Sequence, residues 1–207
     1  MGRHDRRKNK IYRKRMRKKT FVMAVVLIVV LAFGYMKFYH QSTVTQDEIP
    51  SWITQDLIYE ADPSQRNLRR VNDIVIHYTA NPGSTAKANR DYFAQDTTQV
   101  NSHFVVGLDG EIIQCVPLYM QSVASNTRND DTISIEVCHP DSTGEFTLAS
   151  YNSTVRLTAW LCDTFGISRT NVIRHGDITG KNCPKYFMEN PEAWEEFKMY
   201  VKKYNFQ

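Results

Sequence analysis

The sequence predicts an α/β domain with a single mixed β-sheet and flanking helices, preceded by one N-terminal transmembrane helix. An uncharged apolar run at residues 20–36 directly follows a strongly basic segment, which is typical of a membrane-spanning helix. From about residue 66 onward, short β-branched runs alternate with longer amphipathic segments, which is typical of strands and helices packed in one domain. The chain of 207 residues has room for one domain of about 100–150 residues after the apolar run, but not for two.

The net charge of +4 conceals two parts of opposite charge. Residues 1–19 contain eleven basic residues and one acid, which gives +10, whereas the remaining 188 residues contain 15 basic and 21 acidic residues, which gives −6. An acidic body does not indicate nucleic-acid binding, so we expect no nucleic-acid partner. With 42% hydrophobic residues, the chain is not disordered throughout, and four cysteines are too few for a small disulfide-stapled fold.

The apolar run of 17 residues corresponds to a helix of about 25 Å, close to the ~30 Å hydrocarbon core of a bilayer. Because basic residues flank its N-terminal side, we expect a cytoplasmic tail at 1–19, a signal anchor at 20–39 and the domain outside the cell membrane. A cleaved signal peptide is the alternative, since Ala32 and Gly34 are small residues at suitable positions for cleavage. A buried core helix is a third interpretation, which the basic flank disfavours.

Residues 40–65 are expected to be a linker, and residues 66–207 the folded domain. The linker is polar and contains Pro50 and Pro63, without sustained apolar periodicity. Apolar side chains within residues 52–59 are expected to form a short amphipathic piece that packs back on the domain.

Within the domain, alternating or β-branched runs predict strands, and longer apolar periodicity predicts helices. The strands are expected at residues 73–78, 102–107, 111–116, 132–138 and 171–174. The helices are expected at residues 84–95, 152–165 and 191–204. Ser84 is a plausible N-cap, Asp109-Gly110 is a hairpin signal and Gly166 is a helix stop.

Three side chains of types that can bind soft metals lie near the ends of these elements. His77 lies at the end of a strand, His175 follows the strand that ends at Arg174, and Cys183 comes eight residues later in a loop rich in Gly and Pro. Two histidines and one cysteine supply three ligands and leave a fourth position open, as in catalytic zinc sites. A histidine at a strand end is also commonly a hydrogen-bonded structural residue, so the spacing alone leaves both interpretations open.

The segments Ile76–Ala80 and Arg174–Pro184 resemble those of zinc-dependent N-acetylmuramoyl-L-alanine amidases, the family of phage lysozyme-type amidases and peptidoglycan recognition proteins. The segments Asn101–Glu111 and Ile133–Val137 follow the family's order between them, and the resemblance covers roughly residues 70–200. It implies the family's amidase fold and a peptidoglycan hydrolase. The bond cleaved would be the amide between N-acetylmuramic acid and L-alanine of the stem peptide.

Residue by residue, the resemblance places the ligands of one zinc ion on His77, His175 and Cys183. It also implies that Glu136 transfers the proton of the zinc-activated water and that Lys181 stabilises the oxyanion. Alternation along the strand places Glu136 on the face opposite its apolar neighbours, although a solvated glutamate and an ordinary loop lysine are the alternatives.

This sequence departs from some relatives at Ser102, where they carry a catalytic tyrosine. A serine hydroxyl cannot serve as the same acid or base, so the departure leaves Glu136 as the group that must transfer the proton. His103, which follows it, is expected to be structural.

Four further residues are expected around the site. Thr79, Asn81 and His139 follow strand ends and are expected to line the cleft and contact substrate. Asp177 is expected to orient His175 through a carboxylate contact outside the metal ligands.

Two other functions remain alternatives. A peptidoglycan-binding module without activity would typically lack the cysteine ligand, so the presence of Cys183 argues against it. A thiol-dependent peptidase is the other alternative, but nothing here resembles its motifs. The remaining cysteines, Cys115, Cys138 and Cys162, are expected to be buried free thiols. We expect peptidoglycan and, through residues 20–39, membrane lipid as partners of a monomer.

Overall fold

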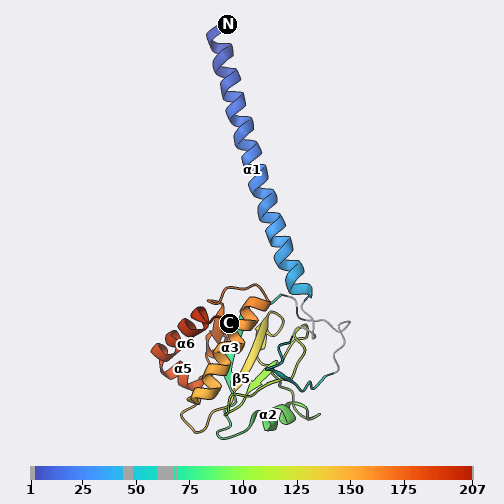
Figure 1. The fold of residues 1–207 in the computed structure, drawn as a ribbon, viewed down its shortest axis with the longest axis vertical. Coiled ribbons are helices and arrows are strands. Elements are labelled where there is room, and N and C mark those ends of the chain that lie inside the picture. The colour runs from blue at the N-terminus through green and yellow to red at the C-terminus, as the bar shows by residue number, and fades with distance from the viewer. Residues whose placement is uncertain (1–2, 44–48, 60–67, 69, 207) are drawn as a thin grey trace. The chain divides into compact units, whose positions relative to one another are not determined.

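The computed structural model describes residues 3–43, 49–59, 68 and 70–206 (Figure 1). The chain divides into two compact units, with the boundary in sequence between His40 and Gln41. Helix α1 (Arg3–Thr43) makes up the described part of the first unit and ends just past this boundary, and the second unit contains all the strands and the other helices of the described residues.

Helix α1 contains one segment that is long and apolar enough to cross a membrane, Tyr12–Met36. None of this segment is buried, and side chains such as Phe21 and Ile28 are 70% and 64% exposed. Core helices of globular proteins bury at least one apolar face. The exposure of α1 gives no support to the alternative of a buried core helix.

The second unit is built around one mixed sheet, which within the described residues has six strands in the order β1-β4-β3-β5-β2-β6. The strands are β1 (Thr54–Gln55), β2 (Asp73–Tyr78), β3 (Phe104–Val106), β4 (Ile112–Gln114), β5 (Thr132–Val137) and β6 (Val172–Arg174). Within this sheet, β3 and β4 are antiparallel, and every other neighbouring pair is parallel. The expected mixed sheet is confirmed.

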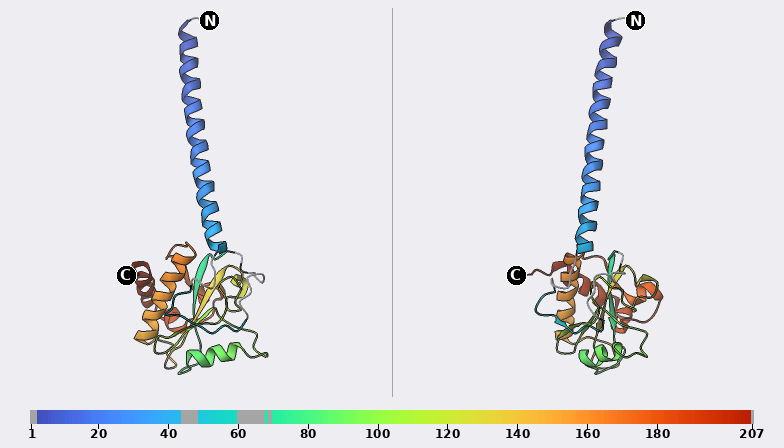
Figure 2. Two further views of the ribbon diagram at one scale, coloured as in Figure 1. Left: turned by 45° about the vertical axis from the view of Figure 1, so that its right-hand side comes forward. Right: turned by 90° about the vertical axis from the view of Figure 1, so that its right-hand side faces the viewer.

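The helices of this unit pack on both sides of the sheet. They are α2 (Ala86–Phe93), α3 (Leu148–Thr164), α4 (His175–Thr179), α5 (Lys185–Glu189) and α6 (Pro191–Lys203), with a short 3₁₀ helix η3 (Asn126–Arg128). α3 and α6 lie side by side (Figures 1 and 2) and share the main apolar core with β5. α2 packs on β3 and β4, where a second, smaller apolar cluster forms around Val105, Cys115 and Cys138.

Local side chains determine where two of these helices begin. Thr85, rather than the expected Ser84, is the N-cap of α2, because its hydroxyl accepts a hydrogen bond from the backbone N–H of Ala88 at 3.1 Å. α3 begins earlier than the expected residue 152, because the hydroxyl of Thr147 caps its first turn. α3 ends before Gly166, as expected, and that glycine has a φ of +59°.

Residues 49–59, which we expected to belong to the linker, form part of the domain. Ile49 and Ile53 are buried in the main core, and Trp52 packs against it. β1, within the same segment, adds an edge strand beside β4. Burial of an apolar side chain contributes about 1.5–3 kcal/mol, which explains why this polar-looking segment is held on the domain. The expected boundary between linker and domain lies outside the described residues.

The hairpin between β3 and β4 turns at Gly110, as expected, and packs against the first turn of α3. Gly110 has a φ of +85°, and an added Cβ would lie 2.9 Å from the carbonyl oxygen of Ala149. Gly110→Ala is therefore expected to lower the free energy of unfolding by about 1–3 kcal/mol. Urea unfolding followed by tryptophan fluorescence measures this loss, because the three tryptophans lie in the second unit.

Gly83→Ala is the matched control for this prediction. Gly83 has a φ of +75°, but its added Cβ would meet no atom closer than 3.9 Å. The control therefore carries the backbone strain without the steric clash. An equal loss of stability in both variants would contradict the close packing of the hairpin against α3.

Candidate metal centre

The register of the parallel strands brings three of the expected site residues to one edge of the sheet. On one side of β2, His77 is paired with Glu136 of β5. On the other side, Ile76 is paired with Arg174 of β6, so that the next residue, His175, follows beside His77. The centroids of the two imidazole rings are 4.6 Å apart. Side chains at the carboxyl ends of parallel strands are well placed to form a site.

Cys183 reaches this edge through α4 and the segment that follows it. The backbone N–H of Gly176 donates a hydrogen bond to the carbonyl oxygen of Cys183 at 2.7 Å. Gly180, with a φ of +73°, ends α4 and turns the chain back. A Cβ on Gly176 would lie 2.6 Å from the carbonyl oxygen of Lys181, so a glycine is needed where the two segments approach each other.

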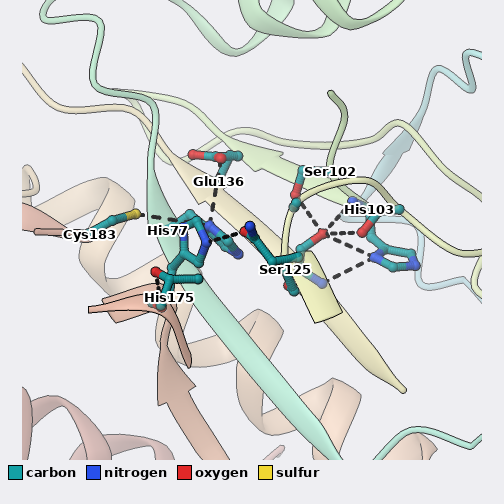
Figure 3. A network of polar contacts seen from close by, with 12 residues as sticks. His77, Ser102, His103, Ser125, Glu136, His175 and Cys183 are labelled. Atoms are coloured by element: carbon teal, nitrogen blue, oxygen red, sulfur yellow. Dashed lines mark hydrogen bonds and ion pairs between the residues drawn. The ribbon is translucent and has the colours of Figure 1, made fainter. Parts of the chain in front are cut away.

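The side chains of His77, His175 and Cys183 gather at one point (Figure 3). One ligand atom from each of them lies within 4.8 Å of the other two. Sγ of Cys183 is 4.0 Å from Nδ1 of His77, and Nε2 of His77 is buried without a hydrogen-bond partner among the described residues. A buried imidazole with one ring nitrogen unpaired among the described residues, next to a second imidazole and a thiol, fits a bound metal ion.

The protonation states of these side chains also suit a metal. Burial, with the nearby His175 and Lys181, lowers the pKa of His77 well below its usual value. Burial and then Lys181 lower the pKa of His175. Both rings are therefore neutral at pH 7 and have a free lone pair. Burial raises the pKa of the Cys183 thiol to about 12, and the thiol is therefore protonated at pH 7. Because a metal binds the thiolate, binding of a cation would release this proton.

Glu136 lies on the polar face of β5 beside this cluster. Its Oε1 is 3.9 Å from Nδ1 of His77, and its Oε2 is buried without a hydrogen-bond partner among the described residues. Burial raises the pKa of Glu136 to about 8, although 18% of the side chain remains exposed. Because His77 is neutral, the contact is not an ion pair. A carboxyl group with a pKa near neutrality and access to solvent is suited to accept and release a proton.

His175 is held by a residue that the sequence analysis missed. Its Nε2 is 3.0 Å from Oδ1 of Asn126, which lies 49 positions away in the sequence. The expected partner, Asp177, forms an ion pair with Arg174 at 2.7 Å and accepts the backbone N–H of that residue at 2.9 Å. The prediction that Asp177 orients His175 is therefore wrong. Asn126 belongs to no local pattern of metal ligands, and the sequence contains no signal that would identify it.

The other expected residues lie at different depths around the cluster. Lys181 is exposed, and its charge lowers the pKa of both imidazoles. The hydroxyl of Thr79 is buried without a partner among the described residues, whereas Asn81 is exposed. His139 is buried, with its ring 5.1 Å from that of Tyr78. The contacts of these residues with substrate remain predictions.

A buried polar network occupies the same face of β5, two residues before the expected catalytic glutamate (Figure 3). The hydroxyl of Ser134 is hydrogen-bonded to those of Ser102 and Ser122, at 3.0 and 2.7 Å. Nδ1 of His103 accepts the backbone N–H of Ser134 at 3.1 Å, and Nε2 donates to the carbonyl oxygen of Met120 at 2.9 Å. Both ring nitrogens of His103 therefore have protein partners, as expected for a structural histidine.

The three other cysteines are buried free thiols, as predicted. They are Cys115, Cys138 and Cys162, and burial raises the pKa of each to about 12. Away from a bound cation, a thiol with so high a pKa stays protonated and unreactive.

A protein-family model described as N-acetylmuramoyl-L-alanine amidase matches residues 67–186, which is more than half of the chain. The chain belongs to this amidase family. The N-acetylmuramoyl-L-alanine amidase BlyA of Bacillus subtilis strain 168 is 30% identical over 156 residues, which cover 65% of this chain and 42% of BlyA. CwlL of Bacillus licheniformis, named for the same activity, is 28% identical over 152 residues, covering 65% of this chain and 41% of CwlL. The amidase-family chain thus spans about two-fifths of the length of these curated relatives.

Solved structures share the fold of this amidase-family domain. The catalytic domain of XlyA is 27% identical, with a TM-score of 0.60, covering 72% of this chain and 98% of that chain. The structure of PlyL has a TM-score of 0.64 at 24% identity, covering 74% of this chain and 99% of that chain, and supports the fold alone. The amidase fold implied by the sequence is confirmed.

Ser134→Ala is expected to lower the free energy of unfolding by about 1–3 kcal/mol, because it leaves the hydroxyls of Ser102 and Ser122 buried without their shared partner. Ser142→Ala, at an exposed loop position, is the control and is expected to change stability by less than about 0.5 kcal/mol. Urea unfolding measures both variants. A loss in the Ser134 variant no larger than in the control would show that the network contributes nothing to stability.

Proposed function

We propose that the domain is a zinc-dependent peptidoglycan hydrolase that cleaves the amide between N-acetylmuramic acid and L-alanine of the stem peptide. One observation carries the proposal: two neutral imidazoles and a thiol converge beside a buried carboxyl group. Membership of the amidase family, and relatives named as N-acetylmuramoyl-L-alanine amidases, support the same reaction.

His77, His175 and Cys183 would hold one zinc ion and leave one position open. Nitrogen and sulfur ligands suit zinc, whereas magnesium and calcium prefer oxygen ligands. When bound, zinc would polarise the amide carbonyl and lower the pKa of a water molecule from about 15.7 to about 7.

Glu136 would accept the proton of the attacking water and deliver it to the nitrogen of the leaving L-alanine. A pKa near 8 suits both steps, because a base must bind the proton and then release it at neutral pH. Ser102 is buried and hydrogen-bonded to Ser134, so it does not compete for this role.

Lys181 would stabilise the negative charge that develops on the carbonyl oxygen. A charge placed near the reacting atoms contributes about 3–4 kcal/mol to such a transition state. Thr79, Asn81 and His139 would line the cleft and contact the sugar or the stem peptide.

The proposal includes a location at the cell membrane. Residues 20–39 would anchor the chain in lipid, with residues 1–19 in the cytoplasm and the domain outside, where it acts as a monomer on peptidoglycan. The exposed apolar side chains of α1 support the anchor, and a cleaved signal peptide would deliver the domain to the same side. Because the +10 charge belongs to residues 1–19, binding to the wall would depend on contacts in the cleft rather than on net charge.

The chain of 207 residues, purified in detergent, is expected to release free amino groups of L-alanine from cell-wall sacculi. A chelator should stop the release, and added zinc should restore it. Release that survives chelation but stops on thiol alkylation would indicate a thiol-dependent peptidase instead. Sedimentation with sacculi without any release would indicate a binding module.

Two substitutions separate metal binding from proton transfer. Cys183→Ser is expected to lose zinc, whereas Glu136→Gln should keep zinc and lose turnover by about 100-fold or more, since an amide cannot take the proton. Zinc content and L-alanine release measure the two effects. Glu195→Gln, on the exposed face of α6, is the control and should leave both unchanged. Normal turnover in the Glu136 variant would overturn its assignment.

A further inference from the structure

We propose that Asn126 is a positioning residue that fixes the ring of His175 so that its Nδ1 faces the metal. This inference rests on the proposed zinc site. It gives a role in metal binding to η3, a segment that contributes no ligand. The argument depends on the direction of one hydrogen bond and on the backbone that holds its acceptor in place.

The hydrogen bond determines which ring nitrogen is free. Nε2 of His175 is 3.0 Å from Oδ1 of Asn126. An amide oxygen is an acceptor only, so Nε2 must carry the hydrogen and donate it. A cation bound by His175 then has to use Nδ1. Partners of this kind, beyond the ligands themselves, fix the tautomer and orientation of metal-binding histidines.

The backbone of Asn126 is held in an unusual conformation. Its φ is +53°, and among the described non-glycine residues only Ala80 shares a positive φ. Glycine is the usual residue in this region, and asparagine is one of the few others that tolerate it. The position thus has the backbone of a glycine but retains a side chain, and the amide oxygen of that side chain contacts His175.

The neighbouring residues hold this conformation in place. The guanidinium of Arg128 pairs with Asp73 at the start of β2 at 2.6 Å and with Asp131 at 2.7 Å. Oδ1 of Asn129 accepts the backbone N–H of Ser125 at 2.6 Å. These contacts link η3 to β2, the strand that carries the first ligand. Backbone strain persists where the surrounding structure fixes it in this way, and it is common at functional sites.

Asp177 does not offer an alternative to Asn126. Although it lies two residues after His175, its carboxylate accepts hydrogen bonds from the backbone and the guanidinium of Arg174. Asn126 is therefore the partner that the structure gives to the ring of His175.

Three variants of the 207-residue chain test the inference. Asn126→Gly removes the acceptor and relieves the backbone strain, so a loss of metal affinity cannot come from a strained fold. Asn126→Asp keeps an acceptor oxygen at the same place. Ala80→Gly is the matched control, because it relieves a similar strain, at φ +52°, without deleting a contact to His175.

Zinc affinity is measured in detergent by competition with a chelating dye, and the cobalt absorption spectrum reports on ligand geometry. Asn126→Gly is expected to bind zinc about 10–100-fold more weakly and to alter the cobalt spectrum. Asn126→Asp and Ala80→Gly should stay within a few-fold of the parent chain. Thermal unfolding without metal, followed by tryptophan fluorescence, should show that Asn126→Gly is at least as stable as the parent.

The outcomes distinguish this inference from the proposed function. If the parent chain binds no zinc, both are overturned. If the parent binds zinc and Asn126→Gly binds it equally well, the inference alone is overturned. A failure of Asn126→Asp to bind zinc better than Asn126→Gly would also overturn it, because an acceptor oxygen would then have no effect.

Discussion

The parallel pairing of β2 with both β5 and β6 is the constraint on which the site depends. It sets His77 opposite Glu136 and places His175 immediately after the residue opposite Ile76. Because side chains alternate along a strand, a slip of one residue would turn His77 into the core and Ile76 into the site. Ile74 and Ile76 are fully buried, and moving them to the polar face would cost several kcal/mol, which fixes the register. Main-chain pairing therefore positions three chemically active side chains.

The same alternation separates the core from the chemistry along β5. Ile133, Ile135 and Val137 join the main apolar core, whereas Ser134 and Glu136 lie on the polar face. Unpaired polar atoms buried on that face cost stability, and the core beneath α3 and α6 offsets this cost. The same burial keeps the histidines neutral and raises the pKa of Glu136. A less buried edge would leave both histidines and the glutamate nearer their ordinary pKa values.

The fold could be predicted where apolar spacing continues over many residues. β2, β5, α3 and α6 have such patterns, and the structure contains each of them. By contrast, η3 has three residues and α4 and α5 have five each, so no helical period can develop in them. For residues 49–59 only the packing of residues 52–59 on the domain was expected. The strand β1 was not, because it has only two residues, and the burial of Ile49 depends on a surface formed by distant segments.

The residues of the candidate site also differ in how far they could be predicted from the sequence. His77, His175 and Cys183 are identifiable because metal ligation permits few residue types at those positions. An orienting hydrogen bond requires only an acceptor in the right place, and many residue types can supply one. Proximity in sequence favoured Asp177, but the start of α4 uses that carboxylate as a cap. Asn126 acts from 49 positions away, through a backbone conformation and an Arg128 ion pair that exist only in the folded chain. The metal ligands can be predicted from the chemistry of their side chains, whereas the contacts that support them depend on the fold.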